Sequence, residues 1–499
     1  MKRILIDRFV KAGLLLLLLT IGSCEDFLNK PLQGELTQAN FPVTQEDALL
    51  ATNAVYNILR TNSYHQGLFP ILDIMSDDGR KGSNPDDAAA TVGPYDVFQH
   101  IPTEGNISRW WNTLYEGVKR ANVVTEKVQA IVMDENLKGR YIGEAKFLRA
   151  LFYFDLVRAW GGVPISTTTT PALDQTRASV EEVYGLIEQD LIDAMGVLPE
   201  KSQYPAGDLG RATKGAAKGL LAKVYLFQND FINAEKYAME VINSGEYALE
   251  QNFEDANSVN GEHGVESVFE IGSAPYESLI NGGSQYANVQ GVRGTPNRGW
   301  GFNRPTIDLQ NSFEADDPRL DATVIYLGEV LDGVTILGDG QTPDETRDGN
   351  GTLIEIECYN QKTWTPGQTV PPSFGHNRRI LRYADVLLMA AEALNENGKS
   401  AEALIYLNEI RARARGGNVG ILPDVSDTDK NILRDKIFLE RRHELALEGH
   451  RFWDLVRTGR APAVLGPLGF ITGKHELLPI PQSEIDLTQK RISQNPQWD

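Results

Sequence analysis

Between Gly143 and Ile165 the apolar residues recur at the three- and four-residue spacing of an α-helix, and they do so on two faces. One face carries Ala145, Leu148, Phe152, Leu156 and Ala159, and the other carries Phe147, Leu151 and Phe154. A helix that is apolar on two faces is covered from both sides, so this segment is predicted to be the central helix of an α-helical body. Gly161 and Gly162, followed by Pro164, are expected to end it.

The few polar positions on this helix are Lys146, Arg149, Asp155 and Arg158. Arginine is rarely buried without a partner, so we expect ion pairs here rather than ligand contacts. Further helices are predicted over residues 47–60, 111–131 and 179–198 from the same periodicity. Ser179 with Glu182 three residues later is typical of a capping box, and it places the start of the last of these helices.

Two segments share a pattern of small and apolar residues that is typical of tetratricopeptide-type helix pairs. In residues 219–242 Tyr225 is followed nine residues later by Ala234, and in residues 386–410 Leu394 is followed at the same distance by Ala403. Such pairs must stack on others to bury their second face. The predicted fold is therefore mainly α, with stacked tetratricopeptide-like helix pairs in one body and no flexible linker.

Regular periodicity disappears in residues 61–108, and it is weak in an insertion of about residues 250–377. Alternating runs at 265–271 and 353–359 predict a few short strands within the insertion, which is otherwise rich in Gly, Asn and Pro. Residues 431–449 form a charge-dense helix. Its charges and those that follow, from Glu440 to Asp454, are expected to pair with one another at three- and four-residue spacing.

The chain has 499 residues and a net charge of −20, from 68 acidic and 48 basic residues. This charge repels phosphate backbones, and no basic cluster stands out, so nucleic-acid binding is unfavourable. The only cysteines are Cys24 and Cys358, and no disulfide framework is expected. Neither a cofactor nor a metal site is predicted.

Residues 1–23 have the features of a lipoprotein signal peptide: Lys2 and Arg3 near the start, then a leucine run too short to span a bilayer, then small residues. Cys24 follows directly and is the expected site of acylation. Residues 24–40 are predicted to be a tether and residues 41–499 a single body, without a transmembrane helix. The mature protein is thus expected to be held at a membrane by its lipid.

Familiar catalytic motifs fail in this chain. His443-Glu444 and His475-Glu476 lack the second histidine of a zinc protease helix, and Gly398-Lys399-Ser400 fits a turn between paired helices better than a phosphate loop. Glycoside hydrolysis needs only two carboxylates, and the adjacent Asp77 and Asp78 are the candidates for that alternative. The acidic stretch 339–350 lacks the spacing of a helix-loop-helix calcium site, so a calcium function there stays open.

Several stretches together resemble the SusD/RagB family of Bacteroidetes. They are the EDFLNKP that follows Cys24, WNTLYEGVKRAN, GEAKFLRALFYFDLVRAWGGVPI, LLAKVYLFQNDFINAEKYAMEVI, RYADVLLMAAEALNENGKSAEALIYLNEIRARA, ERRHELALEGHRFWDLVRTG and LLPIPQSEIDL. The resemblance extends from residue 24 to the end of the chain. It implies a surface-exposed outer-membrane lipoprotein, without enzymatic activity, that captures a glycan for a SusC-type TonB-dependent transporter. Glu25 and Asp26 are similar to the surface-export signal of such lipoproteins.

A sugar ring presents a face of C–H groups and a rim of hydroxyls, so a glycan site needs flat aromatic side chains with polar groups beside them. The loops supply the candidate ligand-binding residues Trp300, Trp364, Tyr286, Tyr276, Tyr95, Asp77, Asp78 and Arg80. Trp300 is the leading candidate, because Gly299 and Gly301 are expected to leave its ring approachable and its backbone mobile. The tryptophans in helical patterns, which are Trp111, Trp160 and Trp453, are expected in the core. A peptide-binding protein on this scaffold and a tetratricopeptide-type scaffold that binds only proteins remain alternatives.

Overall fold

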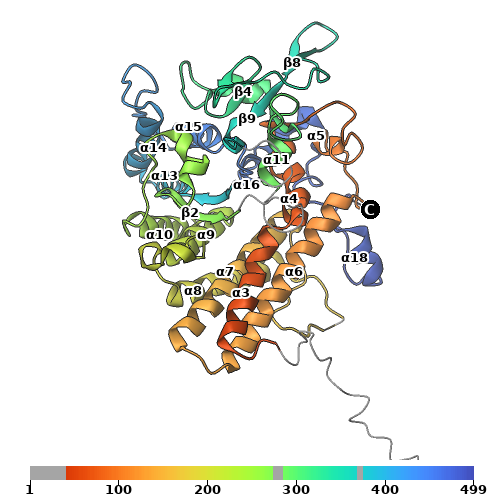
Figure 1. Cartoon of the computed structure of the whole chain (residues 1–499), viewed down its shortest axis with the longest axis vertical. Coiled ribbons are helices and arrows are strands. Elements are labelled where there is room, and N and C mark those ends of the chain that lie inside the picture. Colours follow the sequence, from red (N-terminus) through yellow and green to blue (C-terminus); the bar gives the residue numbers. More distant parts are fainter. Residues whose placement is uncertain (1–40, 173, 274–284, 368–374, 499) are drawn as a thin grey trace, which may run out of the picture. The chain divides into compact units, whose positions relative to one another are not determined.

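The computed structural model describes residues 41–172, 174–273, 285–367 and 375–498, and from Thr44 onward they form one compact unit (Figure 1). Its longer helices are α3 (Gln45–Leu59), α4 (Asn62–Phe69), α6 (Gly105–Lys127), α7 (Glu135–Trp160), α8 (Val180–Val197), α9 (Lys214–Phe227), α10 (Phe231–Ile242), α13 (Tyr383–Glu396), α14 (Ser400–Ala414), α15 (Lys430–Glu444) and α16 (Arg451–Arg457). Within these ranges no helix has both the length and the apolar character needed to cross a bilayer. The mainly α-helical class predicted from periodicity is confirmed.

The predicted central helix is α7, which begins at Glu135, ten residues before the first residue of the apolar stripes, Ala145. Asp134 caps its first turn, and Gly161 ends it with a φ of 73°. Helices α6 and α8 pack against it, and its apolar residues on both faces are buried, as the two stripes require. Ser179 and Glu182 form the predicted capping box at the start of α8.

The polar residues of α7 make the expected ion pairs. Arg149 pairs with Asp190 of α8 at 2.7 Å, and Lys146 pairs with Asp193 of the same helix. Arg158 pairs with Asp155 one turn before it. These ion pairs lie at the polar positions of the central helix. The aromatic residues of its two stripes therefore pack against apolar neighbours.

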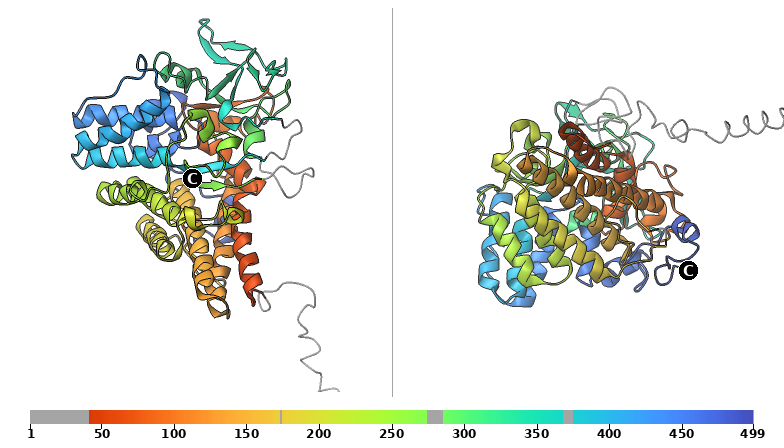
Figure 2. Two further views of the ribbon diagram at one scale, coloured as in Figure 1. Left: turned by 60° about the vertical axis from the view of Figure 1, so that its left-hand side comes forward. Right: turned by 90° about the horizontal axis from the view of Figure 1, so that it is seen from below.

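The two predicted helix pairs are α9 with α10 and α13 with α14. Ala234 and Ala403 are fully buried, which lets the paired helices approach closely. Helix α13 packs on α10 although the whole insertion separates them in sequence, and Figure 2 shows the cyan and blue helices beside the yellow-green pair. The stacking of helix pairs across an insertion is therefore confirmed, and the glycine turn at Gly398 lies between α13 and α14.

Short antiparallel strand pairs occur in the described part of the chain, most of them within the insertion. They are β1 (Gly79–Gly82) with β3 (Phe302–Pro305), β2 (Ser267–Ile271) with β10 (Arg378–Arg382), β4 (Val324–Tyr326) with β9 (Cys358–Asn360), β5 (Val330–Leu331) with β6 (Val334–Thr335) and β7 (Glu345–Arg347) with β8 (Leu353–Ile356). The short strands predicted from the runs at 265–271 and 353–359 are confirmed, and the second run holds two of them. This second run divides at Glu357 because β8 pairs with β7 whereas β9 pairs with β4.

The charges of α15 and the turn after it do not pair mainly among themselves, as was expected from their spacing. Glu440 binds Arg319 and Arg411, and Arg441 binds Asp385 of α13 at 2.9 Å. Arg441 also binds Asp454 at 3.1 Å, a pair within the charged segment. Most partners lie elsewhere because this helix is covered, and a buried charge must take whichever opposite charge the fold places beside it.

Candidate functional site

A cleft that is open to solvent lies in the insertion, and about 190 Å³ of it is available to the centres of water-sized groups. Three segments line it: the short helices η5 (Phe253–Ala256) and η6 (Val259–Gly261), the turn of the β5–β6 hairpin, and η7 (Gln361–Thr363) with the residues after it. Its lining includes Glu254, Asn257, Ser258, Asn260, Asp332, Gln361 and Trp364. We refer to it as the Trp364 cleft.

Trp364 follows η7 directly and forms the aromatic part of the cleft wall. Its indole Nε1 donates a hydrogen bond of 2.7 Å to Asp332 Oδ2, and the Arg298 guanidinium lies 5.5 Å from its ring centroid. The ring is half-buried, and it packs against a small core formed by Val292, Ile325, Ile336 and Tyr359. The Trp364 ring is therefore fixed in place at the edge of the cleft. A fixed aromatic face is suited to stacking against a sugar ring.

Asp332 is placed by the tight turn that joins β5 to β6. Asp332 and Gly333 have φ values of 52° and 75°, and these positive values are those of a type I′ hairpin turn, for which Asp-Gly is a preferred pair. The turn directs the carboxylate to the Trp364 indole. Sequence analysis missed Asp332, although Asp-Gly between two short apolar runs is a recognised hairpin signal.

Glu448 lies behind the Trp364 cleft and accepts hydrogen bonds from two of the segments that line it. Its Oε1 accepts hydrogen bonds from Lys362 Nζ at 2.7 Å and from Asn257 Nδ2 at 3.1 Å. Arg382 adds bonds of 2.8 Å to both carboxylate oxygens. Lys362 also donates to the carbonyl oxygen of Glu444 at 2.9 Å, which fixes η7 from within.

Although burial acts to raise the pKa of Glu448, the charges of Arg382 and Lys362 hold that pKa well below its ordinary value. Burial lowers the pKa of Lys362, against the attraction of Glu448. Both side chains are only 3% exposed, so this pair is shielded from solvent. The positive charge of Lys362, which also lines the cleft, is thus neutralised by Glu448.

The lining of the cleft includes polar side chains that could form hydrogen bonds with a ligand. The side-chain oxygen of Gln361 is buried and has no hydrogen-bond partner among the described residues. Asp332 uses one carboxylate oxygen for the Trp364 indole, and Glu254 and Asn260 are exposed on the opposite side of the lining. Acceptors and amides beside a held aromatic ring are the arrangement that sugar hydroxyls require.

Asp77 and Asp78 lie away from this cleft and are engaged in ion pairs. Arg451 binds both oxygens of Asp77 at 2.8 Å, and Arg442 binds Asp78 at 2.7 Å. Burial acts to raise the pKa of Asp77, but the hydrogen bonds and charge of Arg451 bring it below its ordinary value, whereas burial raises the pKa of Asp78. Arg80 stands on β1 opposite Arg304 of β3, and it does not line the cleft.

Tyr95 and Tyr286 do not line the Trp364 cleft. Tyr95 is fully buried with its ring stacked on His100 at 5.0 Å, and Tyr286 is 8% exposed beside His65. Neither ring therefore has a free face for a sugar. Tyr276 lies outside the described residues. The three helical tryptophans Trp111, Trp160 and Trp453 are buried as predicted, at no more than 3% exposure.

Trp300 is half-buried and does not line the cleft, and its glycine neighbours have a different role from the one expected. A Cβ at Gly299 would lie 2.4 Å from the Asn288 carbonyl oxygen and 2.7 Å from Gly291 Cα. The Trp300 N–H also donates to the Asn288 oxygen at 2.8 Å. Close backbone packing thus accounts for the glycine at position 299.

Among the described residues, no group of three His, Cys, Asp or Glu side chains is arranged to hold a metal ion. In the acidic stretch 339–350, Asp339 accepts the backbone N–H groups of Gln341 and Thr342 and pairs with Arg293. Its carboxylate is therefore engaged in shaping the loop.

Comparison with known proteins identifies the class to which this fold and cleft belong. The model of the SusD family matches residues 265–467, which include Trp364, Lys362 and Glu448, and a model described as starch-binding associating with outer membrane matches residues 81–226. SusD-like protein P2 of Formosa agariphila is 30% identical over 97% of this chain and 99% of its own length. The chain belongs to the SusD family, and the resemblance found in the sequence is confirmed.

Solved structures agree with this assignment. A laminarin-binding SusD-like protein matches with a TM-score of 0.77 at 30% identity, covering 91% of this chain and all of its own. Surface glycan-binding protein A from Bacteroides thetaiotaomicron, in complex with laminarihexaose, matches with a TM-score of 0.76 at 25% identity over the same shares. The insertion and the helix pairs are thus features of a known fold.

Proposed function

We propose that this protein binds a glycan in the Trp364 cleft and has no enzymatic activity of its own. The observation that carries the proposal is the fixed Trp364 ring at the edge of a cleft whose lining also provides amide, hydroxyl and carboxylate groups, among them those of Asn257, Ser258 and Asp332. An aromatic face with polar groups around it matches the two surfaces of a sugar ring. The proposal draws further support from the SusD-like relatives whose names describe laminarin or glycan binding.

The proposal replaces most of the ligand residues expected from the sequence. Asp77 and Asp78 are engaged by Arg442 and Arg451, which leaves them poorly suited both to sugar binding and to glycoside hydrolysis. Tyr95 and Tyr286 are buried. Trp364 remains, joined by Asp332, Asn257 and Gln361, while Trp300 stays an untested candidate outside the cleft.

The direct test is to measure glycan binding by Trp364→Ala. We expect the affinity to fall at least about tenfold, or about 1.4 kcal/mol, because the ring supplies the stacking surface. Tyr237→Ala on α10 is the matched control, since Tyr237 is an aromatic residue that stacks on Tyr225 far from the cleft lining. Binding should be measured by calorimetry on a panel of oligosaccharides, with circular dichroism to check the fold.

Unchanged affinity in folded Trp364→Ala would refute the assignment of the site. If Trp300→Ala weakens binding instead, the platform lies at that residue. A wild-type protein that binds peptides and no glycan in the panel would favour the peptide-binding alternative. Binding to proteins alone, through the helix pairs, would favour the scaffold alternative.

We further propose that the protein is anchored in the outer membrane through acylated Cys24, faces the cell exterior and delivers its glycan to a SusC-type TonB-dependent transporter. This part rests on the family and on the lipoprotein pattern of residues 1–24, which lie outside the described residues. Gentle detergent extraction from the native host should recover the protein with a large β-barrel. Recovery as a lone monomer while the barrel is expressed would contradict this proposal.

A further inference from the structure

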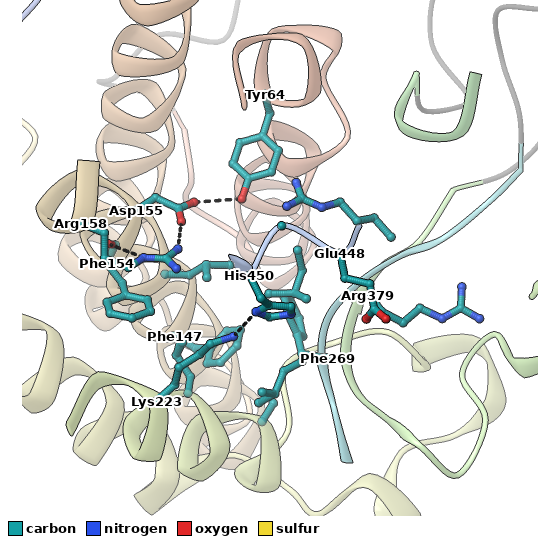
Figure 3. Close-up of a pocket in the computed structure, with 17 residues that line it drawn as sticks. Tyr64, Phe147, Phe154, Asp155, Arg158, Lys223, Phe269, Arg379, Glu448 and His450 are labelled. Atoms are coloured by element: carbon teal, nitrogen blue, oxygen red, sulfur yellow. Dashed lines mark hydrogen bonds and ion pairs between the residues drawn. The ribbon is translucent and has the colours of Figure 1, made fainter. Parts of the chain in front are cut away.

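A second cavity, separate from the Trp364 cleft, lies where the helical body meets the base of the insertion. About 40 Å³ of it is available to the centres of water-sized groups, and it is lined from α4, α7, α9, β2, β10 and the turn from Glu448 to His450. Figure 3 shows Tyr64, Asp155 and Arg158 joined by hydrogen bonds in its lining, and Lys223 in contact with His450. We refer to it as the junction cavity.

The lining of the junction cavity carries an excess of positive charge. It includes the cations Arg158, Lys223, Arg378 and Arg379 but only two carboxylates, Asp155 and Glu448. Burial lowers the pKa of His450 to about 3, so this histidine is neutral. The protein as a whole has a net charge of −20, so the positive charge of this cavity is opposite in sign to that of the whole chain. A cavity lined by cations favours the binding of an anion.

Three of the four cations have carboxylate partners. Arg158 pairs with Asp155, Lys223 binds Asp385 at 2.9 Å, and Arg379 lies 3.5 Å from Glu270. Among the described residues, no carboxylate lies within ion-pair distance of Arg378. The unbalanced charge of the junction cavity therefore resides on this one side chain.

Arg378 is only 5% exposed, and its Nε and Nη1 are buried without a hydrogen-bond partner in the described part of the chain. Its guanidinium lies 5.9 Å from the ring centroid of Tyr64 and 5.3 Å from that of Tyr286. Aromatic rings attract the charge, but they do not satisfy the N–H donors in the plane of the guanidinium. A buried charge in this condition is costly, and a bound anion would remove the cost.

The remaining lining of the junction cavity is apolar and aromatic. It includes Phe147, Leu151, Phe154, Leu220, Phe269 and Leu381. An inorganic anion would gain nothing from these side chains, whereas a short hydrocarbon chain would be removed from water against them. The lining therefore combines one guanidinium that has unsatisfied hydrogen-bond donors with a hydrophobic surface.

We propose that the junction cavity binds a short aliphatic carboxylate whose oxygens accept hydrogen bonds from Arg378. A carboxylate matches the planar guanidinium through two parallel hydrogen bonds, and its alkyl chain packs on the apolar lining. This site is distinct from the glycan cleft. The ligand would stabilise the contact between β10 and the helical body.

The test is thermal unfolding of the full chain titrated with sodium butyrate at constant ionic strength and neutral pH. Wild-type protein should show a saturable rise in Tm of about 2–3 °C at a hundredfold excess over Kd. Arg378→Met should lose this rise. Arg347→Met is the matched control, because it removes the same charge from a side chain that is 50% exposed on the β7–β8 hairpin, and it should keep the full response.

Arg378→Lys provides a second variant should Arg378→Met fail to fold, since it keeps the charge and loses the planar pair of donors. It should bind butyrate more weakly than wild type, which calorimetry can measure directly. Absence of a saturable response in wild type, or a full response in either Arg378 variant, would overturn the proposal. An equal response to sodium chloride would overturn the assignment of an aliphatic carboxylate.

Discussion

Lys362 offers a test of whether the buried charges behind the Trp364 cleft position its ligand-binding wall. The side chain lies two residues before Trp364 and is 3% exposed. Its Nζ is held by Glu448 Oε1 at 2.7 Å and by the Glu444 carbonyl oxygen at 2.9 Å. Lys362→Met keeps the volume of the hydrocarbon stem and removes only the charged donor.

The expected cost follows from what remains around Glu448. Removing one partner of a buried ion pair costs about 3–5 kcal/mol when the other charge is left alone. Here Arg382 and Asn257 still donate to Glu448, so we expect the lower end, about 3 kcal/mol. Unfolding entropy scales with chain length, and for a compact unit of this size it corresponds to about 1 kcal/mol per degree, so Tm should fall by about 3 °C.

The functional consequence is a change in the position of η7 and of the ring that follows it. Glycan affinity of Lys362→Met should fall by about three- to tenfold, because the site loses preorganisation. Calorimetric binding and Tm should be measured together on Lys362→Met and on Lys399→Met. Lys399 is the control because its ion pair with Glu235 is exposed, and its replacement should alter neither quantity.

Two results would refute this reasoning. An unchanged Tm would mean that the Lys362–Glu448 pair adds nothing to the stability of the fold. A lower Tm with unchanged glycan affinity would mean that Lys362 stabilises the insertion without positioning Trp364.

Three further predictions concern pH, ligand charge and anchoring. Burial lowers the pKa of His376 and His450 to about 3 and of His443 to about 4, so between about pH 6.5 and 4 the unfolded chain binds protons that the folded protein does not. The histidines should therefore destabilise the fold as the pH drops through this window, whereas Asp73 and Asp96, whose pKa values burial raises to about 7 and about 6, act in the opposite direction. Tm should fall less from pH 7 to 4 in His376→Gln than in wild type, and an equal change in both would contradict the burial of His376. Because the Trp364 cleft carries Glu254 and Asp332, uronic acid oligosaccharides should bind at least about tenfold more weakly than neutral ones of equal length, and equal affinities in calorimetry would disprove this preference. Cys24→Ser should release the protein into the periplasm or medium, since it removes the acyl acceptor, and its retention in carbonate-washed membranes would exclude lipid anchoring through this residue.

The helical body could be predicted from the sequence because its signals are short-ranged. The two apolar stripes of α7, the capping box at Ser179 and the nine-residue offset before Ala234 each act within a few turns of one helix or one helix pair. Periodicity and capping depend on neighbours three to nine residues away, so they can be recognised in the chain itself. The stretches that carried the family resemblance include α7 and the helix pair that contains Ala234.

The cleft depended on contacts that no local pattern records. Trp364 meets Asp332, 32 positions before it in the sequence, and Lys362 meets Glu448, 86 positions after it. Tyr95 and Asp78 are of residue types that often bind sugars. In the folded protein, however, the Tyr95 ring stacks on His100 and the Asp78 carboxylate pairs with Arg442. An aromatic or charged side chain in a loop suits both sugar binding and the interior, and only the tertiary structure decides which, because burial is a property of the surroundings and not of the residue.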